Sequence, residues 1–193
     1  MYTKGFGLLS KMQPRIKIST ASMRLPFHGC TPTYIHTICM GNCCQSSVNP
    51  NGILVVIHPF EQARLLEQYP KVKIKNNHLV AYNKRCPFKS SINLCTLHNT
   101  NYKPFGCITS PFTLNKSGTL IVRNRYKLLR CYKQKPLLQA YIAFSQSLQL
   151  ILGKKSARAL TVHLKKNKGD YYTTIDRKIH TMLTDNDFAK RKL

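Results

Sequence analysis

Acidic residues are scarce in this chain of 193 residues. It contains six Asp and Glu against 31 Lys and Arg, which gives a formal net charge of +25. Glu61 and Glu67 are the only acids before Asp170. A hydrolase that works through paired carboxylates is therefore not expected. The excess of positive charge favours nucleic acid or another polyanion as a partner.

Long apolar runs are missing as well. The longest, residues 53–57, has the length of a strand, so we expect no membrane partner. Near the N-terminus the apolar run 7–9 is too short for a secretory signal. No Gly-x-Ser-x-Gly motif and no P-loop occurs. We therefore expect a cytoplasmic protein whose thiols stay reduced.

Cysteine, by contrast, is abundant, and its eight residues form two clusters with no acidic residue nearby. The first cluster is Cys30, Cys39, Cys43 and Cys44, and the second is Cys86, Cys95, Cys107 and Cys131. Free thiols oxidise, cross-link or bind metal. In a reducing compartment, such an ordered set predicts a soft-metal site for iron or zinc rather than disulfides.

The residues around the cysteines favour a site with more than one metal ion. Gly41 can adopt a positive φ, which lets the chain curl around one centre. The adjacent pair Cys43-Cys44 suits an iron–sulfur cluster or two neighbouring sites better than one tetrahedral zinc. No C-x2-C pair occurs, so zinc-finger templates do not match. Residues 30–132 hold 13 Lys and Arg, and such cations would favour the thiolate form.

Short motifs accompany the cysteines in a fixed order. They are Gly-Asn-Cys-Cys at 41–44, Cys-Pro-Phe at 86–88, Leu-Cys-Thr-Leu-His at 94–98, Lys-Pro at 103–104 before Cys107, and Pro-Phe at 111–112 after it. Over roughly residues 28–133, this order and spacing resemble the YkgJ-type cysteine-cluster family. The resemblance implies a domain that chelates zinc or iron through its eight cysteines.

The chain departs from that family in two places. Its first cluster is C-x8-C-x3-CC instead of the compact C-x2-C-x2-CC, so Cys30 matches least well. Lys103 stands where an arginine usually precedes the proline. A relative of the family, the flagellin lysine N-methylase, carries a similar domain, so a methyltransferase-like enzyme is an alternative. No Gly-rich loop for S-adenosylmethionine is present, and no catalytic residue is assigned.

Short β-branched runs between turn signals predict strands. These strands cover residues 53–58, 72–75, 78–82, 112–115 and 119–123, of which the last four form two hairpins. Pro59 predicts a helix over 60–69. From Pro136 a helical stripe of Leu137, Tyr141, Phe144, Leu148 and Ile151 runs to a stop at Gly153. A last helix is predicted after Asp170 as its N-cap, with Tyr171, Ile175, Ile179 and Met182 on one face.

These patterns predict an α+β fold, in which a small cysteine-stapled metal-binding core with short strands and hairpins is followed by C-terminal helices. We divide the chain into three parts. Residues 1–25 are a loosely structured basic lead-in, 26–133 the cysteine-cluster metal-binding core, and 134–193 a helical C-terminal extension packed on that core.

Several residues have a second interpretation. His98 can join the metal site or hydrogen-bond a sulfur, but a packed or solvated histidine is the preferred interpretation, and Cys131 fits a strand in the core. Cations and aromatics mix over 123–133, as on nucleic-acid surfaces, exposed strands or the surroundings of a thiolate site. Residues 154–158 and 165–168 predict a solvated face or a phosphate-binding surface. A basic nucleic-acid-binding protein with a structural zinc site is thus a second alternative, and a secreted disulfide protein is the last.

Overall fold

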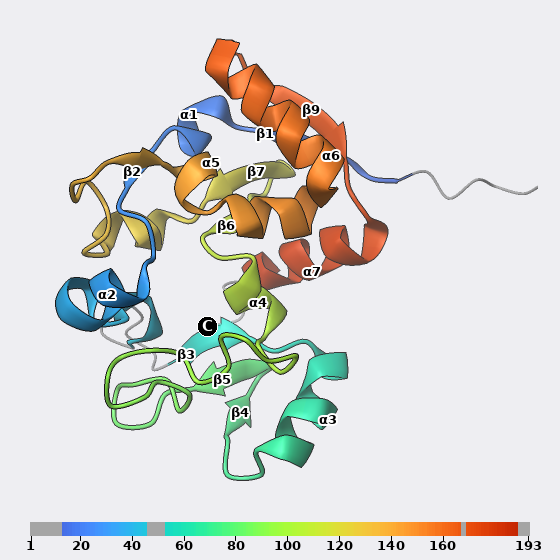
Figure 1. Ribbon diagram of the computed structural model, residues 1–193. Coiled ribbons are helices and arrows are strands. Elements are labelled where there is room, and N and C mark those ends of the chain that lie inside the picture. The colour runs from blue at the N-terminus through green and yellow to red at the C-terminus, as the bar shows by residue number, and fades with distance from the viewer. Residues whose placement is uncertain (1–12, 46–52, 167–168, 189–193) are drawn as a thin grey trace, which may run out of the picture.

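The computed structural model describes residues 13–45, 53–166 and 169–188. Its strands are β1 (Arg15–Ile18), β2 (Pro26–Phe27), β3 (Ile53–Val56), β4 (Ile74–Lys75), β5 (His78–Val80), β6 (Phe112–Leu114), β7 (Thr119–Val122), β8 (Leu138–Gln139) and β9 (Tyr171–Thr174). Its α-helices are α1 (Thr20–Met23), α2 (Pro32–Tyr34), α3 (Pro59–Gln68), α4 (Phe105–Ile108), α5 (Ala140–Ala143), α6 (Ser145–Lys166) and α7 (Arg177–Phe188). The predicted α+β class, with short strands in small sheets and helices at the C-terminal end, is confirmed (Figure 1).

A four-stranded sheet with the order β6-β7-β1-β9 organises the larger part of the molecule. Strands β6 and β7 form one of the predicted hairpins, and β1 lies parallel to β7 and antiparallel to β9. Ile16 and Ile18 of β1 are buried because alternate side chains of a strand face the same side. In Figure 1, α5 and α6 run along one side of this sheet, and α7 contacts β6.

Helix α6 is interrupted at Gly153, whose φ of 76° lies in the left-handed region. No atom lies within 4 Å of the place that a Cβ would take, so the backbone conformation alone favours glycine here. The predicted helix does end at this residue, but a second helical stretch follows directly. Leu160 and Leu164 of that stretch are buried in the core, which explains why the chain continues as helix.

A second apolar cluster is formed by the sheet β3-β5-β4, by α3 and by the loops that follow. Its buried members are Val55, Ile57, Leu65, Leu79, Phe88 and Leu97. The predicted β4-β5 hairpin is confirmed and turns at Asn76 and Asn77, both with positive φ. Pro59 is the first residue of α3, as predicted. Three cysteines pack against this cluster, namely Cys86, Cys95 and Cys107.

Two sequence predictions are wrong. Within the expected lead-in 1–25, residues 13–25 contain β1 and α1 and are not loosely structured, while residues 1–12 lie outside the described part of the chain. Asp170 does not cap a helix, because the residues after it pair with β1 as strand β9. Helix α7 begins instead after Asp176, whose Oδ1 accepts hydrogen bonds from the N–H groups of Lys178 (2.8 Å) and Ile179 (3.2 Å).

The helix expected from Pro136 begins later, at Ala140, because residues 138–139 pair with β2. The larger core takes its buried residues from Ile16 to Leu183 and so crosses the expected boundary between 133 and 134. The division of the chain at 26 and 134 stays a prediction. No helix in the described ranges has the length and apolar character needed to cross a bilayer.

Asp170 joins β9 to the N-terminal part of the chain. Its Oδ2 lies 2.8 Å from Lys17 Nζ, and its Oδ1 accepts a hydrogen bond from Thr20 N–H at 3.0 Å. The hydrogen bond from Lys17, followed by that from Thr20, lowers the pKa of the Asp170 carboxyl. A carboxylate with a lowered pKa stabilises the fold above its unfolded pKa of about 3.9, and this contribution is lost as the pH falls through the folded pKa.

We therefore expect Asp170→Asn to lower the Tm by about 1–3 °C at neutral pH, since the pair is largely exposed. The difference from wild type should shrink as the pH falls through the lowered pKa of the Asp170 carboxyl, because both proteins are neutral at this position below it. Thermal unfolding followed by circular dichroism at neutral and at acidic pH measures this. A Tm difference that is equally large at the acidic pH would rule out the carboxylate as its cause.

Candidate metal centre

The backbone brings the two sequence clusters of cysteines together. Cys86 N–H donates a hydrogen bond to the carbonyl of Cys44 at 3.0 Å, and the neighbouring residues Gln45 and Arg85 form an isolated β-bridge. On the other side of this junction, His36 Nδ1 lies 2.9 Å from the carbonyl oxygen of Ile92. The segments around residues 36–45 and 85–93 therefore pack directly on one another.

A tight reversal of the chain positions the first cluster. A π-helical turn, Ile35–Cys39, ends at Met40, and both Met40 and Gly41 have left-handed φ values of 51° and 55°. A Cβ on Gly41 would lie 2.9 Å from the carbonyl oxygen of Asn93, so the close approach also requires glycine. A 3-10 turn, Asn42–Cys44, follows at once. The positive φ predicted for Gly41 is thus confirmed.

Electrostatic interactions between the thiols define two groups of four. The first group is Cys30, Cys39, Cys43 and Cys131, in which every thiol interacts with the other three. The second group is Cys44, Cys86, Cys95 and Cys107, in which Cys44 interacts with Cys86 and Cys107, and Cys107 with Cys95. Cys131 thus lies with the first group although it comes last in the sequence, since its carbonyl accepts a hydrogen bond from His28 N–H at 2.8 Å.

The adjacent pair Cys43-Cys44 joins the two groups. Their sulfur atoms are 3.9 Å apart, and Cys107 also interacts with Cys43. The hydrogen bond that the Cys43 thiol donates to Cys44, together with burial of the sulfur, raises the pKa of the Cys43 thiol well above its ordinary value. The residue as a whole is nevertheless exposed. All eight thiols are within the described residues, and none forms a disulfide.

Burial keeps most of these thiols protonated. It raises the pKa of Cys30, of Cys107 and of Cys131 to about 12 in each case, and it raises the pKa of Cys39 as well. Neighbouring thiols contribute in the same direction, because two thiolates repel each other. A bound cation would reverse this balance, since it stabilises several thiolates at once.

Basic side chains surround the two groups. Four cations interact with the thiols: Lys89, Lys103, Arg125 and Arg130. Lys103 acts on both Cys30 and Cys107, and its positive charge favours their thiolates. Among the described residues, none of the main charge partners of these thiols is Asp or Glu. The surroundings therefore compensate negative charge that would develop on the sulfurs.

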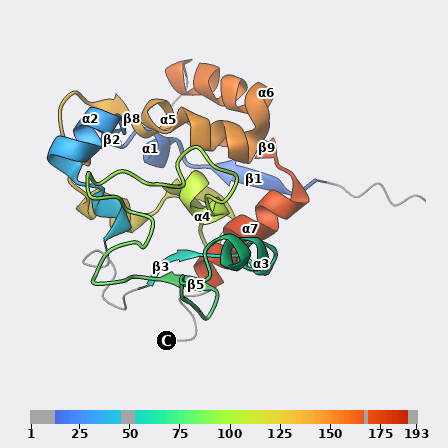
Figure 2. The same cartoon turned by 60° about the horizontal axis from the view of Figure 1, so that its bottom comes forward.

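Two of these cations also hold the loops in place. Lys89 Nζ donates a hydrogen bond to the carbonyl of Met40, which fixes the second cluster on the reversal of the first. Arg130 donates through its guanidinium to the carbonyl of Ile38 at 3.2 Å, and its own carbonyl accepts from the Tyr34 hydroxyl at 3.1 Å. Figure 2 shows α2 and the segment behind it lying against the green loops that carry the second group.

Glu61 holds the start of the helix that contains Cys107. This residue is only 8% exposed, and its Oε2 accepts a hydrogen bond from His58 N–H at 3.0 Å at the start of α3. Its Oε1 accepts from Phe105 N–H at 2.7 Å, at the start of α4, the helix that contains Cys107. In the sequence, the only sign of this role is the position of Glu61 three residues after His58, which fits a capping box. Nothing in the sequence singled out Lys89.

His98 lies beside the site but faces a lysine. Its residue is exposed, and Nδ1 is 3.2 Å from Lys103 Nζ. The positive charge of Lys103, and then partial burial, lower the pKa of His98. The neutral imidazole therefore accepts a hydrogen bond from the ammonium group, which favours the interpretation of His98 as a residue outside the ligand set.

The basic stretch 123–133 is not an exposed strand. Residues 124–128 form a 3-10 helix, in which Tyr126 is buried and Arg125 stacks on its ring at 5.4 Å. Arg125 also interacts with the thiols of Cys43 and Cys107. Of the three interpretations of this stretch, support of the thiolate site fits the geometry best.

As the side chains stand, no three Cys, His, Asp or Glu side chains in the described ranges are close enough to hold one metal ion. Comparison of the chain with protein-family models, with curated proteins and with solved structures finds no match. The resemblance to the YkgJ-type family stays a prediction from the quoted motifs.

Proposed function

We propose that this protein binds soft metal through its eight cysteines, as an iron–sulfur cluster or as zinc. The observation that carries the proposal is the gathering of thiols from distant parts of the chain into two adjacent groups of four. Buried thiols occur singly in many cores, and five of these eight pack against the two apolar clusters, but packing alone does not require eight thiols beside one junction. Thiolates are the ligands that iron–sulfur clusters, zinc and copper(I) prefer.

The donor set and its surroundings fit a metal better than they fit disulfides. Two groups of four thiolates would carry a large negative charge, which a metal and the neighbouring Lys89, Lys103, Arg125 and Arg130 offset together. Cys30 and Cys43 lie in exposed loops, so their sulfurs can move toward an ion. Such a site needs reduced thiols, and we therefore place the protein in the cytoplasm.

The sequence favours iron over zinc, because an adjacent pair of thiols suits a multinuclear cluster. In the structure the two groups meet at that pair, an arrangement that can serve either metal. Cys43 and Cys44 lie on different sides of the junction, so each group has its own member of the pair. Four thiolates in each group match the ligand number of one [4Fe–4S] or [2Fe–2S] cluster, and equally that of one structural zinc. The presence of sulfide separates these two forms.

The test is the metal and acid-labile sulfide content of protein purified without oxygen. We expect a brown protein with equal amounts of iron and sulfide and with visible absorption that bleaches on reduction by dithionite. A colourless protein with stoichiometric zinc would show that the thiolate site holds structural zinc and not an iron–sulfur cluster. Protein without either metal that melts at the same temperature before and after addition of iron, sulfide or zinc would refute the proposal.

A further inference from the structure

A groove lies along helix α6, away from the cysteines. It has a volume of about 1020 Å³ and runs past the interruption at Gly153, with residues of α5, α6 and β9 along its sides. Its cations are Lys154, Lys155, Arg158 and Lys166. All four of these side chains are exposed. No Asp or Glu is among the described residues that line it.

The spacing of these residues places them on one ridge. Lys154, Arg158, Val162 and Lys166 follow each other at intervals of four residues, and side chains at this interval lie on the same side of a helix. The helix rises about 1.5 Å per residue, so the ridge extends for about 18 Å. A single phosphate would meet one or two of these cations. A chain of phosphates can meet all of them.

The floor of the groove is apolar. Leu148 and Ala157 are buried beneath it, Tyr171 is half-buried at its side, and Val162 of the ridge is 50% exposed. Asp170, the acid next to Tyr171, is paired with Lys17 at 2.8 Å, which reduces its repulsion of an anion. A cationic ridge can bind a row of phosphates, and an apolar floor can contact the faces of flat rings. A ligand that carries both therefore matches this groove.

We infer that the groove along α6 binds single-stranded nucleic acid, with phosphates on the ridge and bases against the apolar floor. Double-stranded nucleic acid presents its phosphates but keeps its bases stacked inside, so it can use the ridge only. The inference is independent of the metal site, because the groove shares no lining residue with either thiol group.

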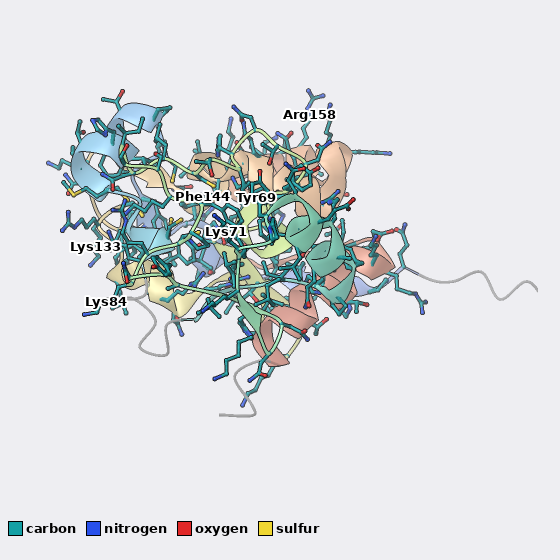
Figure 3. All side chains as sticks on the ribbon, turned by 90° about the horizontal axis from the view of Figure 1, so that it is seen from below. Tyr69, Lys71, Lys84, Lys133, Phe144 and Arg158 are labelled. Atoms are coloured by element: carbon teal, nitrogen blue, oxygen red, sulfur yellow. The ribbon has the colours of Figure 1, made fainter. Side chains whose placement is uncertain are left out.

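The test compares two triple variants that lose the same charge. The groove variant is Lys154→Gln, Arg158→Gln and Lys166→Gln. The control is Lys71→Gln, Lys73→Gln and Lys75→Gln, three exposed lysines around β4, which lies at the opposite end of the molecule from α6 (Figure 1). Figure 3 shows Arg158 at the far edge from Lys84 and Lys133, which lie on the side of the cysteine loops.

Fluorescence anisotropy measures binding of labelled oligouridine, oligothymidine and a duplex of the same length. We expect the groove variant to bind both single strands about tenfold more weakly near 100 mM salt, with a salt slope reduced by about 2, and the control to stay within about twofold of wild type. Equal Tm values of the three proteins show that they are folded.

Two outcomes would overturn the inference. Equal losses in the two triple variants would mean that the overall charge of +25 attracts any polyanion, without a site. Duplex bound as tightly as the single strands would mean that bases do not enter the groove. Preference for oligouridine over oligothymidine, or the reverse, identifies RNA or DNA as the ligand and supports the inference in either case.

Discussion

Replacement of Cys44 by serine should release the metal of the second thiol group, about half of the total, and lower the Tm by about 10 °C or more. Cys44 links the two groups. Its sulfur lies 3.9 Å from that of Cys43, and its carbonyl accepts a hydrogen bond from Cys86 N–H. A serine hydroxyl is a poor ligand for a soft metal, so the second group would keep three thiolates. Metal per chain and thermal unfolding, both measured without oxygen, report the loss.

Two comparisons separate a lost ligand from a lost packing contact. His98→Gln, next to the same loops but paired with Lys103, should keep the metal content and Tm of wild type. After removal of metal, the Cys44→Ser variant and wild type should unfold alike, because the two proteins then differ only by one hydroxyl for one thiol. A Tm difference that persists between the metal-free proteins would mean that Cys44 is a structural core residue and not a ligand.

Replacement of Glu61 by glutamine has the second largest expected effect. The buried carboxylate accepts hydrogen bonds from two backbone N–H groups, those of His58 and Phe105, at the starts of α3 and α4. An amide can accept with its oxygen only, and its NH2 group would face a second donor. Hydrogen bonds to a charged group contribute about 1.5–3 kcal/mol, so we expect a loss of about 2–3 kcal/mol and a Tm lower by about 5–10 °C.

The same helix supplies the matched control for Glu61. Glu67→Gln makes the same chemical change at an exposed position of α3 and should change the free energy of unfolding by less than about 0.5 kcal/mol. Because Phe105 begins the helix that carries Cys107, Glu61→Gln should also weaken metal retention in a chelator challenge. Equal urea denaturation curves for the two variants would show that the buried carboxylate does not hold α3 and α4 together.

Local patterns predicted the structure where turn residues or a proline restrict the backbone. The turn residues Asn76 and Asn77, the glycine at 118 and the proline at 59 each impose one backbone conformation, and the hairpins and helix that they predict are present. The β9 strand was missed because Tyr171 to Thr174 also fit the face of a helix. Pairing with β1, which lies near the other end of the chain, decides between these two conformations, and no local pattern contains it.

The candidate site was predictable as a set of residues but not as an arrangement. Cysteine is rare enough in reduced proteins that eight of them indicate a site by their number alone. Their sorting into two groups depends on contacts such as His28 N–H to the Cys131 carbonyl, which bring the last cysteine to the first. The supporting roles of Glu61 and Lys89 depend on burial and on hydrogen bonds to backbone atoms, which composition does not report.

The strand order β6-β7-β1-β9 also has a consequence for folding during synthesis of the chain. During synthesis, β1 leaves the ribosome first, but its partner β9 follows only after almost all of the chain has been translated. Until then one edge of β1 offers unpaired N–H and C=O groups that can pair with other chains. The region from β3 to α4 has its own apolar cluster, and its strand pairs join residues that are closer in sequence than β1 and β9, so this region can form earlier. Cys86, Cys95 and Cys107, which pack against this cluster, would therefore come together while the larger sheet is still incomplete.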